Sequence, residues 1–256
     1  MNRRPPEMKR YLTAALTLCL ALATPAAAFD LSSMSDTERT AFRAEIRAYL
    51  LDNPEVIMEA VKVLEDRENT AKVADDKNLV KVNADDLFHD PNSWVGGNPD
   101  GDITVVEFMD YRCGYCRKAH DEVNELLSSD GNIRFIRKEF PILGPDSITS
   151  SKFALAVKLI AGDESYQSAS EALITLKSSP EDAVLRRLAN TLDVDADAVM
   201  AKMDSPEVEA IIDANHLLGQ RLQINGTPTF VFQDQMLRGY VPLPGMRAVV
   251  AKLRAD

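Results

Sequence analysis

The order of strand-like and helix-like segments predicts an α/β fold that is interrupted by a block of helices. Residues 103–109 form a strand-like apolar run, a helical pattern begins at Gly114, and residues 132–140 predict a second strand that ends before Pro141. Between residues 144 and 204 the periodicity is helical, and two short strands and a final helix follow. The predicted order is therefore β-α-β, a helical insertion, and then β-β-α.

The first strand and helix are defined by the spacing of their apolar residues. The strand is apolar at most positions, and the helix has apolar residues three and four positions apart. These residues are Val105, Val106, Phe108 and Met109 in the strand and Ala119, Val123, Leu126 and Leu127 in the helix. The pair Cys113 and Cys116 therefore lies where a strand passes into a helix.

Serine–proline pairs predict the starts of two helices in the second half of the chain. Ser179-Pro180 and Ser205-Pro206 each place an N-cap serine before a proline, which the first turn of a helix tolerates. The segments TPTFVF and QMLRG then predict a hairpin, and residues 242–256 predict the last helix.

The region before the α/β domain changes in character along its length. Residues 33–78 are dense in helix formers, Ser35 and Glu38 fit a capping box, and Asn53-Pro54 predicts the start of a second helix. Residues 86–102 are instead rich in turn formers and predict a short strand followed by a loop.

The two N-terminal helices carry a narrow apolar stripe, which offers too little apolar surface for an independent domain. We expect residues 29–84 to be an oligomerisation segment and residues 85–256 to be the α/β domain, with its insertion near residues 144–204. The alternative is that the N-terminal helices fold back on the main domain of a monomer. The stripe consists of Phe42, Ile46, Tyr49, Leu50, Ile57, Val61 and Leu64.

Residues 1–28 have the organisation of a secretory signal peptide. A basic start precedes an apolar stretch from Tyr11 to Ala23, and Ala26-Ala27-Ala28 predicts cleavage near Ala28. Thirteen apolar residues are too few for a membrane anchor, which needs about 20. A lipoprotein site at Cys19 is disfavoured by the bulky residue before it. We therefore expect a periplasmic protein whose mature chain keeps two cysteines and has no structural disulfide.

The charge of the chain excludes some classes of partner. The formal net charge is −11, and removal of the leader, with four basic residues and one acidic residue, makes it about −14. Nucleic acid and anionic membrane are therefore not expected as partners. We interpret the acidic surface as a solubility feature, since 45% hydrophobic residues provide for an ordinary globular core.

The spacing of Cys113 and Cys116 favours thiol exchange over a structural role. A disulfide between them closes a very small ring and removes little chain entropy. A sulfur at a helix N-terminus has a lowered pKa, because the helix dipole and free backbone N–H groups stabilise the thiolate. We expect Cys113 to be the attacking thiol and Cys116 the resolving thiol.

Several charged residues near the pair are candidates for supporting roles. Glu107 lies in the apolar strand, so we expect a buried carboxyl with a raised pKa that relays the proton of the resolving thiol. The alternative is an outward-facing residue at a sheet edge. Lys138 is a candidate partner of Glu107. Lys118 and His120 add positive or titratable character after the pair, although His120 is also explained as an exposed helix residue.

Metal binding is the main chemical alternative for the two cysteines. Tetrahedral zinc sites need a second pair of ligands, and neither His89 nor His216 has a neighbouring ligand in the sequence. With His120 the pair offers at most a transient copper(I) site, so we expect no resident metal and no cofactor. A chaperone or interaction module that does not use the thiols is a third class.

The segments EFMDYRCGYC and NGTPTFVF resemble the exported thiol-disulfide oxidoreductases of the DsbA superfamily. The resemblance implies a thioredoxin fold with a helical insertion over residues 85–256. It also implies that Cys113 is the nucleophile, Cys116 the resolving thiol and Glu107 the buried acid. Thr227-Pro228 takes the place of the cis-proline loop that faces the disulfide and binds substrate.

Two features narrow the expected activity. The dipeptide Gly114-Tyr115, also expected at the substrate site, is similar to that of the disulfide isomerase DsbC, and the N-terminal helices resemble those of suppressor-of-copper-sensitivity C and alpha-proteobacterial DsbA-like proteins. We therefore expect a disulfide isomerase or reductase that forms homo-oligomers through residues 29–83. Its expected partners are exported proteins with cysteines and a membrane-bound thiol-disulfide electron donor or acceptor. A primary oxidase and a copper(I)-binding protein remain the alternatives.

Overall fold

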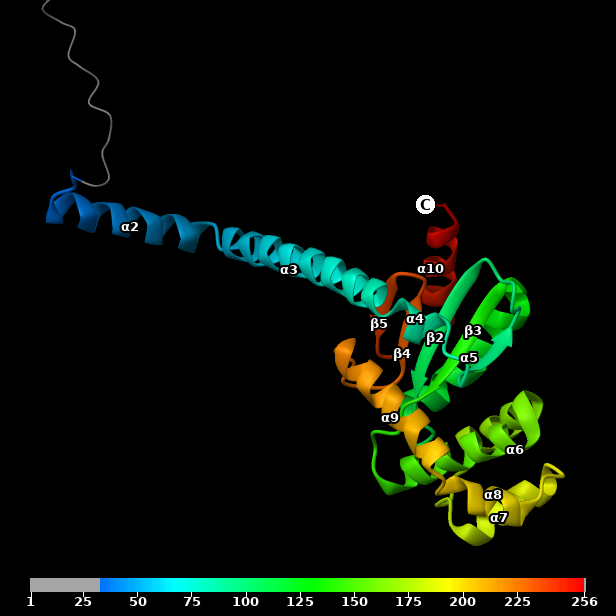
Figure 1. Ribbon diagram of the computed structural model, residues 1–256. Coiled ribbons are helices and arrows are strands. Elements are labelled where there is room, and N and C mark those ends of the chain that lie inside the picture. The colour runs from blue at the N-terminus through cyan, green and yellow to red at the C-terminus, as the bar shows by residue number, and fades with distance from the viewer. Residues whose placement is uncertain (1–32, 256) are drawn as a thin grey trace, which may run out of the picture. The chain divides into compact units, whose positions relative to one another are not determined.

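The computed structural model describes residues 33–255 of the chain. Its contacts divide the chain into two compact units, Met1–Leu64 and Glu65–Asp256 (Figure 1). The predicted signal peptide, its cleavage site near Ala28 and Cys19 lie outside the described residues.

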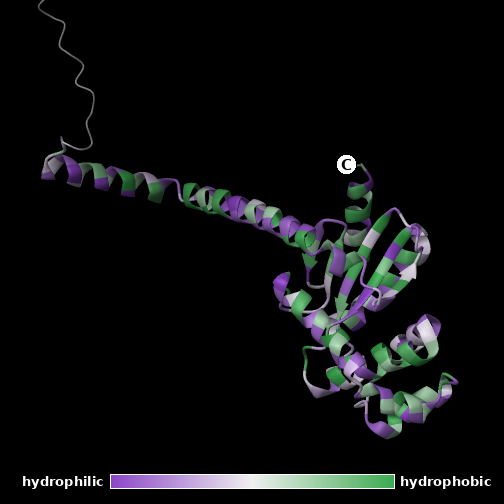
Figure 2. Cartoon of the chain, viewed as in Figure 1, coloured by the Kyte–Doolittle hydropathy of each residue, from purple (hydrophilic) through white to green (hydrophobic). Residues whose placement is uncertain are grey.

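The first unit is helical where it is described. Helix α2, Asp36–Asp52, begins with the predicted capping box, in which the Ser35 side chain accepts a hydrogen bond from the Glu38 backbone and Glu38 bonds back to Ser35. No residue of α2 is buried, and purple and green residues are interleaved along it in Figure 2. Since no residue of α2 is buried, packing in a core contributes little to its stability.

Helix α3, Glu55–Val82, continues well beyond Leu64, where the predicted apolar stripe ends. Those last turns belong to the second unit, where Val80 is buried and Asp76 forms an ion pair with Arg238. The division between the two units therefore falls within α3, after Leu64.

The second unit is built on a five-stranded sheet with the order β1-β3-β2-β4-β5. The two central strands β2 and β3 run parallel, and the other neighbouring pairs are antiparallel. Both central strands are buried at six of their seven positions, as expected for strands that are covered on both faces. The strands are β1 Trp94–Gly97, β2 Ile103–Met109, β3 Ile133–Glu139, β4 Thr229–Phe232 and β5 Gln235–Arg238.

Alternation along β2 directs its side chains into two separate cores. Val105 and Met109 pack with helices α5 to α8 and α10, whereas Val106 and Phe108 pack with α4, α9 and the end of α3. Figure 1 shows α6, α7 and α8 gathered as one helical block. The helices are α4 Ala84–Phe88, α5 Gly114–Asp130, α6 Pro145–Thr175, α7 Asp182–Thr191, α8 Ala196–Met203, α9 Pro206–Arg221 and α10 Leu243–Ala255.

This arrangement is the thioredoxin fold with a helical insertion between β3 and β4, as predicted. Two local predictions were wrong. The region 86–102 does not begin with a strand, because residues 84–88 form α4 and the strand starts only at Trp94. Helix α7 starts at Asp182 with Glu181 as its N-cap, so Ser179-Pro180 does not open it, whereas Ser205 caps α9 as predicted.

Candidate functional site

The two cysteines lie at the start of α5, in a turn that Asp110 holds in place. Cys113 is the N-cap of α5, and its backbone N–H donates to the Asp110 carbonyl at 3.1 Å. The buried Asp110 carboxylate accepts backbone N–H groups of Arg112, Ile142 and Leu143 at 2.8–3.1 Å. One carboxylate therefore joins the cysteine turn to the loop that follows β3.

The thiols differ strongly in their affinity for a proton. The pKa of Cys113 is lowered to about 5, because the Cys116 thiol and then backbone N–H groups of the first turn donate to its thiolate, which outweighs partial burial. Burial, the Cys113 sulfur and the Glu107 charge raise the pKa of Cys116. Both cysteines are free thiols in the structure, with Cys116 the less exposed. Cys113 is thus the thiol of the pair that ionises more readily and is more exposed.

The Thr227-Pro228 segment lies against Cys113. The peptide bond between these residues is cis, as predicted, and the Cys113 thiol donates to the Thr227 carbonyl at 3.1 Å. Thr229 begins β4 directly afterwards, and its hydroxyl donates to the Gly226 carbonyl at 2.8 Å. The loop predicted to face the disulfide therefore lies in contact with the reactive sulfur.

Glu107 is a buried acid in the central strand β2, with 4% of its surface exposed. Burial raises its pKa to about 7, against the opposing effect of Arg137. The alternative of an outward-facing residue at a sheet edge is excluded, because β2 has a neighbouring strand on each side. The charge of Glu107 in turn raises the pKa of Cys116.

Lys138 is not the partner of Glu107, contrary to the prediction. Its ammonium group donates to the Asp90 carboxylate at 2.6 Å and to the Asp86 carbonyl at 2.8 Å. Neighbouring residues of a strand point to opposite faces, so Arg137 lies on the Glu107 side of the sheet and Lys138 on the other. The Arg137 Nε atom is 3.9 Å from the Glu107 Oε2 atom.

A second buried carboxyl, Glu139, was not anticipated from the sequence. It accepts the hydroxyls of Tyr111, Tyr166 and Ser151 at 2.6–2.7 Å. The only available signal was the charged triplet Arg137-Lys138-Glu139 inside an otherwise apolar strand. A fully buried strand carries such charges only when other elements supply partners. Two of the partners of Glu139, Ser151 and Tyr166, come from the distant helix α6.

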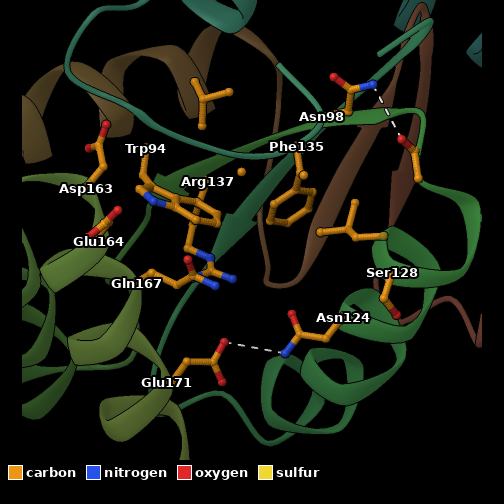
Figure 3. Close-up of a pocket in the computed structure, with 15 residues that line it drawn as sticks. Trp94, Asn98, Asn124, Ser128, Phe135, Arg137, Asp163, Glu164, Gln167 and Glu171 are labelled. Carbon is orange, nitrogen blue, oxygen red and sulfur yellow. Dashed lines mark hydrogen bonds between the residues drawn. The ribbon is translucent and has the colours of Figure 1, made fainter. Parts of the chain in front are cut away.

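A cleft of about 700 Å³ lies beside this buried group, between β1, β3, α5 and α6 (Figure 3). Trp94, Phe135 and Arg137 line its sheet side, and Glu171 lines its α6 side. His120 is buried rather than exposed. Its Nε2 atom lies 2.6 Å from the Glu171 carboxylate. Neither cysteine lines the cleft.

Exposed apolar residues surround the cysteine turn. Tyr115 is 63% exposed and stacks on Tyr240, and the Lys118 ammonium group lies 4.2 Å from the centre of the Tyr240 ring. Ile142 and Leu143, in the loop held by Asp110, are also exposed. An extended chain that reached Cys113 would meet apolar and aromatic side chains in this region.

The helix-capping nucleophile, the shielded second thiol, the adjoining cis-proline loop and the central buried acid define a thioredoxin-fold protein with a redox dithiol. The model of the DSBA-like thioredoxin domain matches residues 104–251, more than half of the chain. The chain belongs to this family. The model of the copper resistance protein ScsC N-terminal domain matches residues 38–71.

Solved structures of similar proteins support the same assignment. A thioredoxin-like oxidoreductase from Silicibacter pomeroyi is 38% identical, with 67% of this chain and 98% of that chain covered and a TM-score of 0.63. The thiol-disulfide exchange protein alpha-DsbA2 from Wolbachia pipientis is 27% identical, with 72% and 98% covered and a TM-score of 0.67.

Curated relatives are much longer than this chain. The Na(+)/H(+) antiporter NhaA 1 of Salinispora arenicola is 28% identical over 158 residues, which cover 61% of this chain and 24% of the antiporter. The chain thus spans about a quarter of the length of the curated relatives it matches.

Proposed function

We propose that the protein is an exported thiol-disulfide oxidoreductase that acts on cysteines of other proteins. The observation that supports this function most directly is the difference between the two thiols at the start of α5. The pKa of Cys113 is lowered to about 5, and that of Cys116 is raised. One thiol is therefore ready to attack at neutral pH, and the other stays protonated until a mixed disulfide has formed.

The proposed reaction proceeds in two exchanges. The Cys113 thiolate attacks one sulfur of a client disulfide, the client S–S bond breaks, and the other client sulfur leaves as a thiolate. Cys116 then passes its proton to Glu107 and attacks the Cys113 sulfur, which releases the client as a dithiol and leaves a Cys113–Cys116 disulfide. The client is reduced by two electrons and the protein is oxidised by two. If a client thiolate resolves the mixed disulfide instead, the client is isomerised and the protein stays reduced.

Client binding is assigned to the surface around Cys113. Thr227 and Pro228 lie against the reactive sulfur, and the exposed Tyr115 and neighbouring Gly114 form the first turn beside it. An extended client segment would lie along the Thr227 backbone, with its apolar side chains on the exposed residues Tyr115, Ile142 and Leu143. Gly114 has open space beside it, which leaves room for the backbone of the client.

We assign the balance of activity to isomerisation and reduction. The Gly114-Tyr115 dipeptide supports this assignment, and so does a self-associating segment at residues 29–83. The described part of that segment, residues 33–83, has eleven large apolar residues exposed, including Phe42, Ile46 and Tyr49, and the ScsC N-terminal domain model matches part of it. Several Cys113 sites around one space would let a client meet a second thiol before it escapes.

The proposed location is the periplasm, after cleavage near Ala28. The leader pattern supports export, and the partner would be a membrane-bound thiol-disulfide donor that keeps the pair reduced. Among helices within residues 33–255, none combines the length and hydrophobicity that crossing a bilayer requires.

Reactivation of scrambled ribonuclease and reduction of insulin test the proposal. We expect activity in the wild type and none in Cys113→Ala. Strong oxidation of reduced ribonuclease without isomerisation would assign the protein as a primary oxidase. Equal inactivity of both proteins, with stoichiometric copper(I) in the wild type, would favour the metal-binding alternative. Suppression of aggregation that survives loss of both thiols would favour a chaperone.

A further inference from the structure

Charged and titratable groups face Glu107 from strand β3 and from the turn that carries the cysteines. Arg137 and Glu139 face it from β3, and Cys113 and Cys116 face it from the cysteine turn. Tyr111 and Tyr166 lie further along the same buried group, where both bond to Glu139. Arg137 is the single cation within this set of described residues, whereas there are two carboxyls.

Hydrogen bonds connect Arg137 to Glu139 through two hydroxyls. The Arg137 guanidinium donates to Ser170 Oγ at 2.7 Å, and Ser170 is 3.0 Å from the Tyr111 hydroxyl, which donates to Glu139 at 2.7 Å. Because Tyr111 has only one proton and gives it to Glu139, Ser170 donates to Tyr111. Every donor in the chain thus points toward the Glu139 carboxyl.

Hydrogen bonds to Glu139 favour its ionised form and oppose the effect of its burial. Three hydroxyls donate to its two oxygens, those of Tyr111 and Tyr166 to one oxygen and that of Ser151 to the other, and a protonated carboxyl has less capacity to accept them. Burial raises the pKa of Glu139, and these hydroxyls and Arg137 oppose the rise. Tyr166 and Ser151 belong to α6, so the insertion supplies most of this support.

Arg137 lies near Glu107 without a hydrogen bond to it, and it is linked to Glu139 indirectly, through Ser170 and Tyr111. Its Nε atom is buried and has no hydrogen-bond partner, and Glu107 is 3.9 Å away, beyond hydrogen-bond reach. In Figure 3 the guanidinium lies by Trp94 and Gln167 in the cleft, and the Trp94 ring centre is 5.1 Å from it. A cation in this position favours the ionised form of Glu107, whereas a charge on the nearby Glu139 disfavours it.

We propose that Glu139 is a positioning residue that competes with Glu107 for the charge of Arg137, so that helix α6 of the insertion sets the charge state of the acid facing the cysteines. The inference rests on the proposed role of Glu107. Loss of the Glu139 charge leaves Arg137 to Glu107 and favours the Glu107 carboxylate. Loss of Arg137 has the opposite effect.

The test follows the carboxyl infrared band of Glu107 against pH in the full-length reduced protein, with Glu107→Gln to assign the band. Glu139→Gln is expected to lower the pKa of Glu107 by about one unit, because it removes a nearby negative charge. Tyr166→Phe, which removes one donor to Glu139, is expected to lower it by less. Arg137→Gln is expected to raise it.

Tyr240→Phe is the matched control, because Tyr240 also donates to a carboxylate, that of Glu122, at 2.6 Å, but outside this group. It should leave the pKa of Glu107 unchanged. An unchanged or raised pKa in Glu139→Gln overturns the proposal, and if that variant does not fold, the same result in Tyr166→Phe does so. The infrared band is measured without substrate turnover. It therefore reports the pKa of Glu107 even if Glu107 takes no part in the proposed reaction.

Discussion

Cys113 and Cys116 have the same side chain and lie three positions apart, yet their pKa values move in opposite directions. The difference comes from position alone. Cys113 caps α5, where N–H groups and the Cys116 thiol donate to its thiolate, whereas Cys116 lies one turn further in, against Glu107. At the residue scale, the helix start favours the thiolate of Cys113, and burial favours the protonated form of Cys116.

Thiolate absorbance of the reduced protein should titrate with a midpoint near the Cys113 pKa of about 5. Cys116→Ala should raise the midpoint, because the largest stabilising hydrogen bond is lost. Since the thiolate is the nucleophile, the rate of attack should fall as the pH drops below the midpoint. A wild-type midpoint at or above about 8.5, the value for an unperturbed thiol, would remove this basis for reactivity.

Glu107→Gln should slow release of the mixed disulfide by on the order of 10²-fold at neutral pH, because the Cys116 proton loses its acceptor. The first attack by Cys113 should change much less. Stopped-flow measurement of the two steps separates them. Glu125→Gln, which changes an exposed acid in α5, is the control, and equal slowing in both variants would contradict the relay.

The stability of the protein should also report Glu107. Its pKa is raised from 4.5 to about 7 in the folded state, so the native state binds the extra proton and loses stability as pH rises through that window. Between pH 4 and pH 8, Glu107→Gln should therefore gain roughly 3 kcal/mol relative to the wild type. Urea unfolding of the reduced proteins measures it, and a pH-independent difference would refute the raised pKa.

At the scale of elements, the position of strand β3 was predictable from the sequence, whereas the contacts of its charged residues were not. Its position and burial were predictable from the apolar spacing of residues 132–140. The partner of Glu107 was not, because Arg137 and Lys138 are adjacent cations and only the register with β2 decides which one shares its face. The role of Glu139 depends on Tyr166 and Ser151 of α6, which no local pattern connects to β3.

Asp110 joins two elements of the site, and Asp110→Ala should separate them. Three backbone N–H groups would lose their acceptor in a buried position, which costs about 1–3 kcal/mol for each group left unsatisfied. We expect lower stability together with faster hydrogen exchange at Ile142 and Leu143. Asp146→Ala, an acid of the first turn of α6, is the comparison, and loss of protection in both variants alike would mean that Asp110 has no specific effect on the loop.

At the scale of the whole molecule, the thioredoxin fold, the dithiol and the cis-proline loop were predictable because each has a local signature in the sequence. The length of α3 was not predictable, because its middle turns are polar. Its last turns belong to the second unit, where Asp76 and Val80 are buried. The exposed apolar residues of α2 and early α3 agree with the predicted stripe, and their partner remains a proposal.

Self-association through the stripe should be sensitive to single charges. Ile46→Asp should reduce the mass measured by light scattering on the mature chain, because it places a charge in the apolar stripe. Arg47→Asp, the next residue and exposed on the same helix, should leave the mass unchanged. A wild-type mass equal to that of one chain would contradict the oligomer, and with it the shared space proposed for isomerisation.

The proposed reaction requires that Cys113 be the sulfur that forms the mixed disulfide. Mass spectrometry after mixing Cys116→Ala with a disulfide-bonded model peptide tests this directly, since the second exchange is blocked and the adduct accumulates. We expect a stable adduct on Cys113, and none when Cys113→Ala is mixed with the same peptide at neutral pH. Two results would contradict the proposed role of Cys113. One is no adduct in either variant, and the other is an adduct on Cys116 in Cys113→Ala that forms as fast as the Cys113 adduct in Cys116→Ala.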